Sequence, residues 1–229
     1  PQGLGDELRQ LLAALDEPRL SGSRLSEVIN RRQQYACLVS PYYTPALKSL
    51  AKVQVRAMYG LAKERWNHAW WNAFYHHILC FSHYSQQALD INGNARVVGN
   101  PRFDKWHRGE VDRSALAGLR LDAKKPTLLY APTFGALSSI PHWAESLSRL
   151  SREYNLVVKL HHGTLHRAEE ANDLAIVERH IKKRVTRHDL TLPLLQCADY
   201  VLTDNSGFIF DAIHAGKRVI LLDWAGMDD

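Results

Sequence analysis

The sequence predicts an α/β protein with two doubly wound domains, each a parallel sheet covered by helices on both faces. Three observations predict this fold class. Short apolar runs alternate with helical stretches along most of the 229 residues, as in chains built from strand–helix–strand units. The apolar runs are only four to six residues long, which is typical of buried strands. A charged, glycine-containing segment at 111–125 interrupts the alternation, which then starts again.

The alternation gives each element an expected place. We expect an N-terminal Rossmann-like domain over 1–110, a linker at 111–125 and a C-terminal Rossmann-like domain over 126–229. Two amphipathic helices, at 5–15 and 24–33, lead the first domain. That domain has expected strands at 36–39, 53–58, 78–81 and 96–99, and expected helices at 44–51, 68–77 and 83–90. The second has expected strands at 127–131, 156–160, 200–203 and 219–222, and expected helices at 141–153, 166–182, 189–197 and 207–215.

Both ends of the chain resemble cuts within a longer protein. The first residues already follow a helical apolar pattern, and the last expected strand, 219–222, stands close to the end. A complete second domain needs further elements to finish its sheet. The sequence therefore predicts a truncated chain with an incomplete C-terminal domain.

Charge and composition limit the partners. The net charge is +5 and the pI is near 9.2, which favours acidic partners such as nucleotides, phosphorylated substrates or an anionic membrane surface. We expect no nucleic-acid role, because no helix-turn-helix, RRM or OB pattern is present. No apolar run reaches 18 residues and no signal peptide is evident, so no membrane span is expected. Peripheral association with the inner face of the cell membrane stays open.

The cysteines and histidines predict neither a disulfide framework nor a metal centre. Three cysteines stand far apart without a CxxC pair, which is typical of reduced thiols in a cytoplasmic protein. His68, His76 and His77 could share one helix face, but no carboxylate stands at a matching spacing. We therefore expect no metal site and no cofactor.

Polar residues follow three strands of the second domain at the points where those strands end. Thr133 follows the first, His161 and His162 follow the second, and Asp204-Asn205-Ser206-Gly207 follow the third. The carboxyl ends of parallel strands form the ligand crevice of such sheets, and hydroxyl, imidazole and amide donors there suit a diphosphate. Lys159 either reaches the same anion or extends along the strand edge. The alternative for each residue is structural, as a capped turn or a histidine satisfied within the fold.

Four separated motifs carry a resemblance to a known family. They are VGNPRFD at 98–104, LYAPT at 129–133, VKLHH at 158–162 and ADYVLTDNSG at 198–207. In order and spacing they resemble the CDP-glycerol glycerophosphotransferases of teichoic-acid and capsule polymer synthesis, over roughly residues 36–223. The first motif is also similar to UDP-GlcNAc 2-epimerases.

The resemblance implies a GT-B fold, two Rossmann-like domains facing a cleft, and a CDP-activated donor bound by the C-terminal domain. It implies that His161 or His162 contacts the diphosphate and that Ser206 and Gly207 offer donors at a helix start. Thr133 would complete this cup. An imidazolium at either histidine would also protonate the leaving phosphate. The implied acceptor is a polyol phosphate, a saccharide or a lipid-linked polymer of the cell envelope.

The N-terminal half departs from the family pattern where many relatives carry a His-Gly pair. Here the corresponding residues are Met58-Tyr59-Gly60-Leu61, so Tyr59 replaces the expected base. Tyrosine is a poor base at neutral pH unless a cation such as Lys63 or Arg56 lowers its pKa. His68 is the other candidate. The aromatic segment at 63–77 favours a core position, with an acceptor-binding surface as the alternative.

Two further functions remain open alongside glycerophosphate transfer. The first keeps the fold and makes the protein a UDP-sugar glycosyltransferase or a 2-epimerase. The second is a non-catalytic module that binds a nucleotide or an anionic polymer, which the Tyr59 substitution and the short chain suggest.

Overall fold

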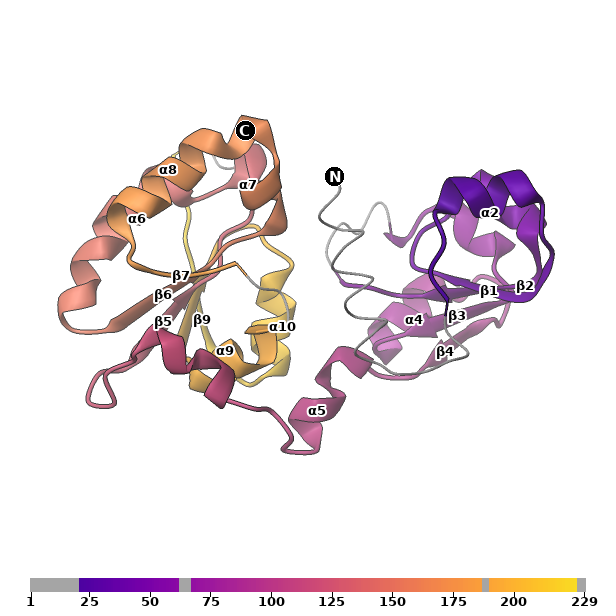
Figure 1. The fold of residues 1–229 in the computed structure, drawn as a ribbon. Coiled ribbons are helices and arrows are strands. Elements are labelled where there is room, and N and C mark those ends of the chain that lie inside the picture. The colour runs from indigo at the N-terminus through magenta and orange to yellow at the C-terminus, as the bar shows by residue number, and fades with distance from the viewer. Residues whose placement is uncertain (1–20, 62–66, 187–189, 226–229) are drawn as a thin grey trace. The chain divides into compact units, whose positions relative to one another are not determined.

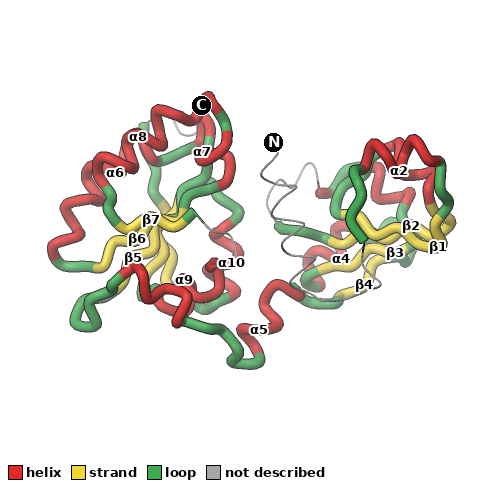
Figure 2. The backbone as a smooth tube through the Cα atoms, in the orientation of Figure 1, coloured by secondary structure: helices red, strands yellow, loops and turns green. Residues whose placement is uncertain are grey.

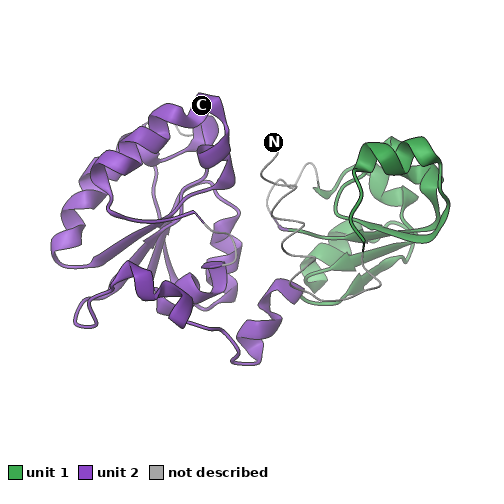
Figure 3. Cartoon of the chain, viewed as in Figure 1, with its two compact units in different colours: residues 1–59, 65–99 green, residues 60–64, 100–229 purple. Residues whose placement is uncertain are grey.

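The computed structural model describes residues 21–61, 67–186 and 190–225 (Figure 1). The chain divides into two compact units, residues 1–59 with 65–99 and residues 60–64 with 100–229 (Figure 3). Each unit holds one parallel sheet with helices packed against it (Figure 2). The expected helix at 5–15 lies outside the described residues, as does Lys63.

The first unit contains a four-stranded sheet in the order β1-β2-β3-β4, with every neighbouring pair parallel. Its strands are β1 (Tyr35–Ser40), β2 (Ala51–Ala57), β3 (His77–Cys80) and β4 (Ala95–Val97). Its helices are α2 (Leu25–Arg31), α4 (His83–Leu89) and the 3-10 helices η1 (Pro45–Leu50) and η2 (Trp70–Phe74). All four expected strands are confirmed.

The expected helix at 68–77 is wrong in kind and in length, because only the short 3-10 helix η2 forms there. The end of this segment is already engaged by the sheet. The backbone N–H of His76 donates to Gln54 O (2.9 Å), and the backbone N–H of Gln54 donates to the His76 Nδ1 (3.0 Å). These two bonds commit His76 to β2 and stop a helix from running into β3.

The second unit contains a five-stranded parallel sheet in the order β7-β6-β5-β8-β9. Its strands are β5 (Thr127–Tyr130), β6 (Asn155–Lys159), β7 (Lys183–Val185), β8 (Tyr200–Thr203) and β9 (Arg218–Leu221). The chain builds outward from β5 through β6 to β7 and then returns to the other side of β5. The order therefore reverses between β5 and β8, where doubly wound sheets bind ligands.

Helices cover both faces of this sheet (Figure 1). The α-helices are α5 (Asp104–His107), α6 (Ile140–Ser148), α7 (His162–His166), α8 (Ala171–His180), α9 (Thr191–Cys197) and α10 (Phe208–His214). The 3-10 helices are η3 (Pro101–Phe103), η4 (Ser114–Leu119), η5 (Gly135–Leu137), η6 (Arg149–Arg152) and η7 (Ala168–Glu170). The helix expected at 166–182 is confirmed over 168–180, as η7 followed by α8, and the extended Arg167 separates it from α7, which the sequence did not predict.

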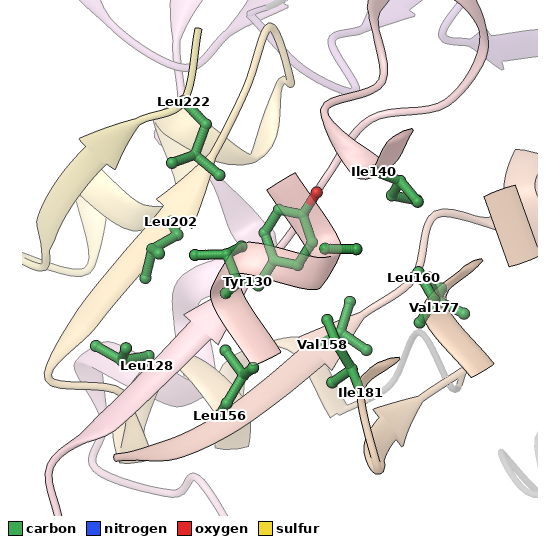
Figure 4. Close-up of a cluster of buried hydrophobic side chains, with 12 residues drawn as sticks. Leu128, Tyr130, Ile140, Leu156, Val158, Leu160, Val177, Ile181, Leu202 and Leu222 are labelled. Atoms are coloured by element: carbon green, nitrogen blue, oxygen red, sulfur yellow. The ribbon is translucent and has the colours of Figure 1, made fainter. Parts of the chain in front are cut away.

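Alternate residues of the central strands point to opposite faces and fill two apolar clusters. Leu128 and Tyr130 of β5 pack under α6 and α8, while Leu129 packs with α9 and α10. Figure 4 shows the first cluster, with the Tyr130 ring among aliphatic side chains. Each fully buried aliphatic or aromatic side chain contributes roughly 1.5–3 kcal/mol. Burial on both faces fixes the strand register and hence the positions of the residues that follow each strand.

Residues 100–125 pack with the second unit. Phe103 and Leu116 are buried in the cluster beneath α9 and α10, so the segment between the two sheets contributes to a core. Among the described residues, no helix is long and apolar enough to cross a bilayer.

Candidate functional site

Asp204, directly after β8, ties the carboxyl end of β8 to the loop after β5. One carboxylate oxygen accepts the backbone N–H of Thr133 (2.8 Å). The other accepts the backbone N–H and the hydroxyl of Ser139 (2.9 and 2.7 Å). The side chain is buried, and burial raises its pKa while these hydrogen bonds oppose the rise. Asp204 therefore fixes the loops after β5 and β8 relative to each other, and both of its carboxylate oxygens already accept hydrogen bonds.

Thr203 strengthens the same junction from within β8. Its hydroxyl donates to Ala131 O (2.7 Å), and the Ala131 N–H donates to Leu202 O (2.8 Å). The pairing of β5 with β8 thus continues past the last residue of β5. This brings the Pro132-Thr133 segment next to the Asp204–Gly207 turn.

Ser206 lies in the turn that leads into α10. Its Oγ accepts the backbone N–H of Phe208 (3.2 Å). A hydroxyl that accepts one bond still has its hydrogen to donate, so Ser206 can act as a donor toward an anion. Asn205 and Gly207 flank it and are exposed.

His161 follows β6 and is held by two contacts. Its Nδ1 accepts the backbone N–H of Gly163 (2.9 Å), which caps α7. A neutral ring in this position carries its hydrogen on Nε2. The ring also stacks on Phe134, with centroids 4.4 Å apart and planes 16° apart. Phe134 comes from the loop after β5, so this stack joins the ends of β5 and β6.

Gly163 makes this stack possible. A Cβ at residue 163 would lie 2.5 Å from the Phe134 ring, which is far inside van der Waals contact. The Arg167 guanidinium lies 4.6 Å from the centroid of the same ring. The residue type at 163 therefore decides whether Phe134 can reach His161.

His162 is exposed beside His161, with ring centroids 4.0 Å apart. Partial desolvation lowers the pKa of His162, and the charges of His166, Arg167 and Lys159 lower it further. His162 is thus neutral at pH 7 in the free protein and becomes easier to protonate once an anion offsets those positive charges.

Lys159, the last residue of β6, is only 9% exposed. Burial lowers the pKa of its ammonium group, Asp211 opposes this, and Arg102 adds to it. Its Nζ lies 5.6 Å from the centroid of the Phe208 ring at the start of α10. Lys159 is therefore turned toward the first turn of α10, the helix that follows Ser206.

Arg102 and Asp211 belong to this region but were not predicted from the sequence. The Arg102 guanidinium donates to the Asp211 carboxylate (2.9 Å). Arg102 stands in the 98–104 motif, and that motif could have identified it as a site residue. Asp211 had no such signal, since an acidic residue on an amphipathic helix is ordinary.

The two base candidates, Tyr59 and His68, lie in the first unit. Tyr59 is 37% exposed, and its ring centroid lies 4.8 Å from that of Tyr42. Desolvation and a hydrogen bond to Tyr59 raise the pKa of Tyr42 to about 12. His68 is partly buried and adjoins Asn67.

Arg56, at the end of β2, is fully buried and lacks a carboxylate partner among the described residues. Its guanidinium donates to Asn67 O (2.8 Å), to Asn67 Oδ1 (2.7 Å) and to Asn72 Oδ1. Desolvation lowers its pKa, and Tyr59 is close enough to oppose that shift. Arg56, which the sequence offered as a cation near Tyr59, is therefore held by two asparagine residues of the first unit.

Aromatic residues of the described part of the 63–77 segment form a surface cluster, with Tyr75 as the buried exception. Tyr43 stacks on Trp71 and on Phe74, and Trp70 contacts Phe74 edge to face. Trp70 is 69% exposed. The Lys48 ammonium lies 4.2 Å from the Phe74 ring centroid. Across the described residues, no group of three His, Cys, Asp or Glu side chains could hold a metal ion.

Comparisons with known proteins match the fold. No family model and no curated protein matches the chain. The wall teichoic acid polymerase TagF is 16% identical with a TM-score of 0.57, over 80% of this chain and 53% of TagF. A TagF variant soaked with CDPG is 17% identical with a TM-score of 0.58, over 82% of this chain and 53% of the TagF chain. The S. aureus MnaA–UDP structure is 13% identical with a TM-score of 0.60, over 92% of this chain and 67% of the MnaA chain.

These likenesses concern architecture. This chain spans about half the length of the polymerase chains that it matches. This chain holds two parallel-sheet α/β units in succession. The chain has the GT-B fold that the sequence predicts.

Proposed function

We propose that this protein is a transferase that moves glycerol phosphate, or a related polyol phosphate or sugar group, from a CDP-activated donor to a cell-envelope polymer acceptor. The observation that carries the proposal is the joining of three strand ends at the switch point of the second sheet. Asp204 links the loops after β5 and β8, and the Phe134–His161 stack links those after β5 and β6. The fold similarity to a polymerase soaked with CDPG supports this class of donor.

In this proposal the donor's diphosphate lies against the joined strand ends. Ser206 donates its hydroxyl hydrogen, and His161 donates from Nε2 because its Nδ1 already accepts a bond. Lys159, at the end of β6, adds a buried positive charge. Donors fixed in this way stabilise charge that develops on a leaving phosphate by several kcal/mol, on the order of 3 for one well-placed donor.

The reaction breaks one phosphorus–oxygen bond and forms another. An acceptor hydroxyl oxygen attacks the phosphorus that carries glycerol, and CMP leaves with the electron pair of the broken bond. The hydroxyl proton passes to a base, for which Tyr59 and His68 are the candidates. Once a diphosphate raises its pKa, His162 carries a proton that it can give to the departing CMP.

The aromatic cluster of Tyr43, Trp70, Trp71 and Phe74 is the proposed contact for the acceptor. Exposed aromatic faces with a neighbouring cation, here Lys48, suit sugar rings and phosphate groups. A polyol-phosphate, saccharide or lipid-linked acceptor each fits this chemistry.

Calorimetry with CDP-glycerol, CDP-ribitol, UDP-GlcNAc and CMP tests the donor assignment. We expect heat from the cytidine nucleotides and its loss in a His161→Ala, Ser206→Ala variant. His77→Ala is the matched control, because it removes an exposed histidine at the start of β3 in the first unit. The absence of heat from every cytidine nucleotide would refute the assignment.

The second candidate is a UDP-sugar transferase or 2-epimerase. It is favoured by the MnaA–UDP structure, which covers more of this chain than the polymerase does. Competition between UDP-GlcNAc and CDP-glycerol for the same protein decides between them, and tighter binding of UDP-GlcNAc selects this candidate.

A third candidate is a non-catalytic nucleotide-binding or polymer-binding module. The observation that favours it is Tyr59, which bonds to Tyr42 where a catalytic histidine is expected. Donor binding without release of CMP, across polyol-phosphate, saccharide and lipid-linked acceptors, would select it. Release of CMP that depends on His161 would exclude it.

A further inference from the structure

A pocket of about 330 Å³ opens at the amino edge of the second sheet, away from the candidate donor site. Its walls come from the start of β6, the start of β7 and the 120–125 loop that leads into β5. The donor site lies beyond the carboxyl ends of these parallel strands, so the two sites stand at opposite edges. The volume falls within the range of small-molecule pockets, which begins at roughly 300 Å³.

The lining of this pocket is strongly cationic. Arg120, Lys125, Lys182 and Lys183 contribute positive charge, against the single carboxylate of Asp122. No hydrogen bond or ion pair to a described residue holds the Arg120 guanidinium or the Lys182 ammonium. The remaining two ammonium groups donate to neutral carbonyls only, Lys125 to Arg152 O (2.7 Å) and Lys183 to Arg120 O (3.3 Å). The described residues therefore leave an excess of positive charge in this pocket.

The 120–125 loop, which supplies two of these cations and the carboxylate, is held in place by hydrogen bonds. The buried amide of Asn155 accepts the backbone N–H of Asp122 (2.9 Å) and donates to Asp122 O and Lys125 O (2.8 and 3.0 Å). Asp122 Oδ1 in turn accepts the backbone N–H of Lys124 (2.9 Å). A preformed loop loses little conformational entropy when a ligand binds.

We propose that this pocket is a second anion site, which binds a ligand carrying two or more phosphate groups. One phosphate would leave most of the space empty, since the pocket equals the volume of about ten water molecules at ~30 Å³ each. The cations also come from two separated segments, the 120–125 loop and the start of β7, and a single phosphate pairs with only some of them. Tyr154, Leu156 and Ile181 supply an apolar wall for the part of the ligand between the phosphates.

Titration of the ¹⁵N-labelled protein with inorganic tripolyphosphate, followed by NMR and calorimetry, tests the proposal. We expect amide shifts in 120–125 and 181–183, and at least a tenfold loss of affinity at this site in an Arg120→Gln, Lys182→Gln variant. Arg113→Gln, Lys124→Gln is the matched control. It removes two exposed charges from the same unit but none from the pocket, and we expect less than a twofold change. Lys182→Gln alone gives the same direction if the double variant does not fold.

Two outcomes would overturn the proposal: no shifts in these segments, or an equal loss of affinity in the control variant. The His161→Ala, Ser206→Ala variant separates this site from the donor site, because the amino-edge shifts persist there. A polyol-phosphate oligomer and CDP are then titrated in parallel to identify the source of the phosphates. The site stands whether or not the donor assignment holds, since its shifts arise at the other edge of the sheet.

Discussion

Asp204 shows how a residue in a binding motif can act entirely through the fold. The sequence places it at the head of a polar turn, next to Asn205 and Ser206, where a role in phosphate binding is a natural expectation. In the structure its two oxygens hold Thr133 and Ser139. A buried anion directly facing a diphosphate would repel it, whereas an anion that fixes two loops helps to preorganise the donors around it.

Asp204→Asn is expected to lower the free energy of unfolding of the second unit by about 2–4 kcal/mol. The amide presents N–H groups where the carboxylate accepted bonds, and a buried donor left without a partner costs ~1–3 kcal/mol. Chemical denaturation measures this loss. Asp112→Asn is the matched control, because Asp112 accepts the backbone N–H and hydroxyl of Ser114 in an exposed position. Equal losses in the two variants would contradict the role of burial.

The lowered pKa of His162 predicts that the protein takes up a proton when the donor binds. This pKa lies below the ordinary 6.5 in the free protein, and a bound diphosphate raises it again. Between these two values the free side chain is neutral and the bound one is protonated, so affinity for CDP-glycerol rises as the pH falls toward 6. Calorimetry in buffers of different ionisation enthalpy measures the proton uptake.

His162→Gln is expected to abolish that uptake, while His77→Gln leaves it unchanged, because His77 is an exposed histidine at the start of β3. The diphosphate of CDP-glycerol has both phosphates esterified and gains no proton in this range, so the signal belongs to the protein. Uptake that survives His162→Gln would assign the proton to another group.

At the scale of elements, α7 packs closely against the loop after β5 because Gly163 has no side chain. Gly163 lies in the first turn of α7, and Phe134 occupies the space where a Cβ would stand. The contact holds His161 flat against Phe134 while the same turn bonds its Nδ1. The orientation of a donor-site histidine thus depends on the packing of a helix against a loop.

Gly163→Ala is expected to weaken nucleotide binding severalfold and to cost ~1–3 kcal/mol of stability, as overpacking usually does. Titration of the variant with CDP-glycerol and its chemical denaturation measure the two effects. Gly118→Ala is the control, since a Cβ there meets no atom within 4 Å. A Gly163→Ala, Phe134→Leu variant should recover stability but not affinity. Unchanged binding in Gly163→Ala would show that the His161–Phe134 stack has no part in the donor site.

At the scale of the whole molecule, the sequence predicts architecture better than it predicts contacts. Alternation of apolar runs and helices identified eight strands and two doubly wound domains, because burial on both sides of a sheet leaves a strong pattern, and the family resemblance added the GT-B fold. β7 was missed since Lys183 and Arg184 give it no apolar run. Trp70 and Phe74 of the aromatic segment were misplaced, because residue type alone does not distinguish an exposed cluster from a core.

The candidate site was predictable to the same degree. Strand ends can be read from the sequence, so Thr133, His161 and Ser206 could be named. The contacts within the site could not be predicted, because Ser139 reaches Asp204 and Phe134 reaches His161 only through the packing of loops. The Asn155 clamp on the 120–125 loop is a contact of the same kind, since it joins residues more than 30 positions apart.

The segment between the two sheets gives a prediction about the whole chain. Phe103 and Leu116 are buried against α9 and α10, so a fragment that begins at residue 100 is expected to be more stable than one that begins at 126. Loss of these two side chains removes ~3–6 kcal/mol of apolar burial at roughly 1.5–3 kcal/mol each. Chemical denaturation of both fragments measures the difference, and a Phe103→Ala, Leu116→Ala variant of the longer fragment should reproduce most of it. Equal stability of the two fragments would show that residues 100–125 act as a linker and not as part of the second unit.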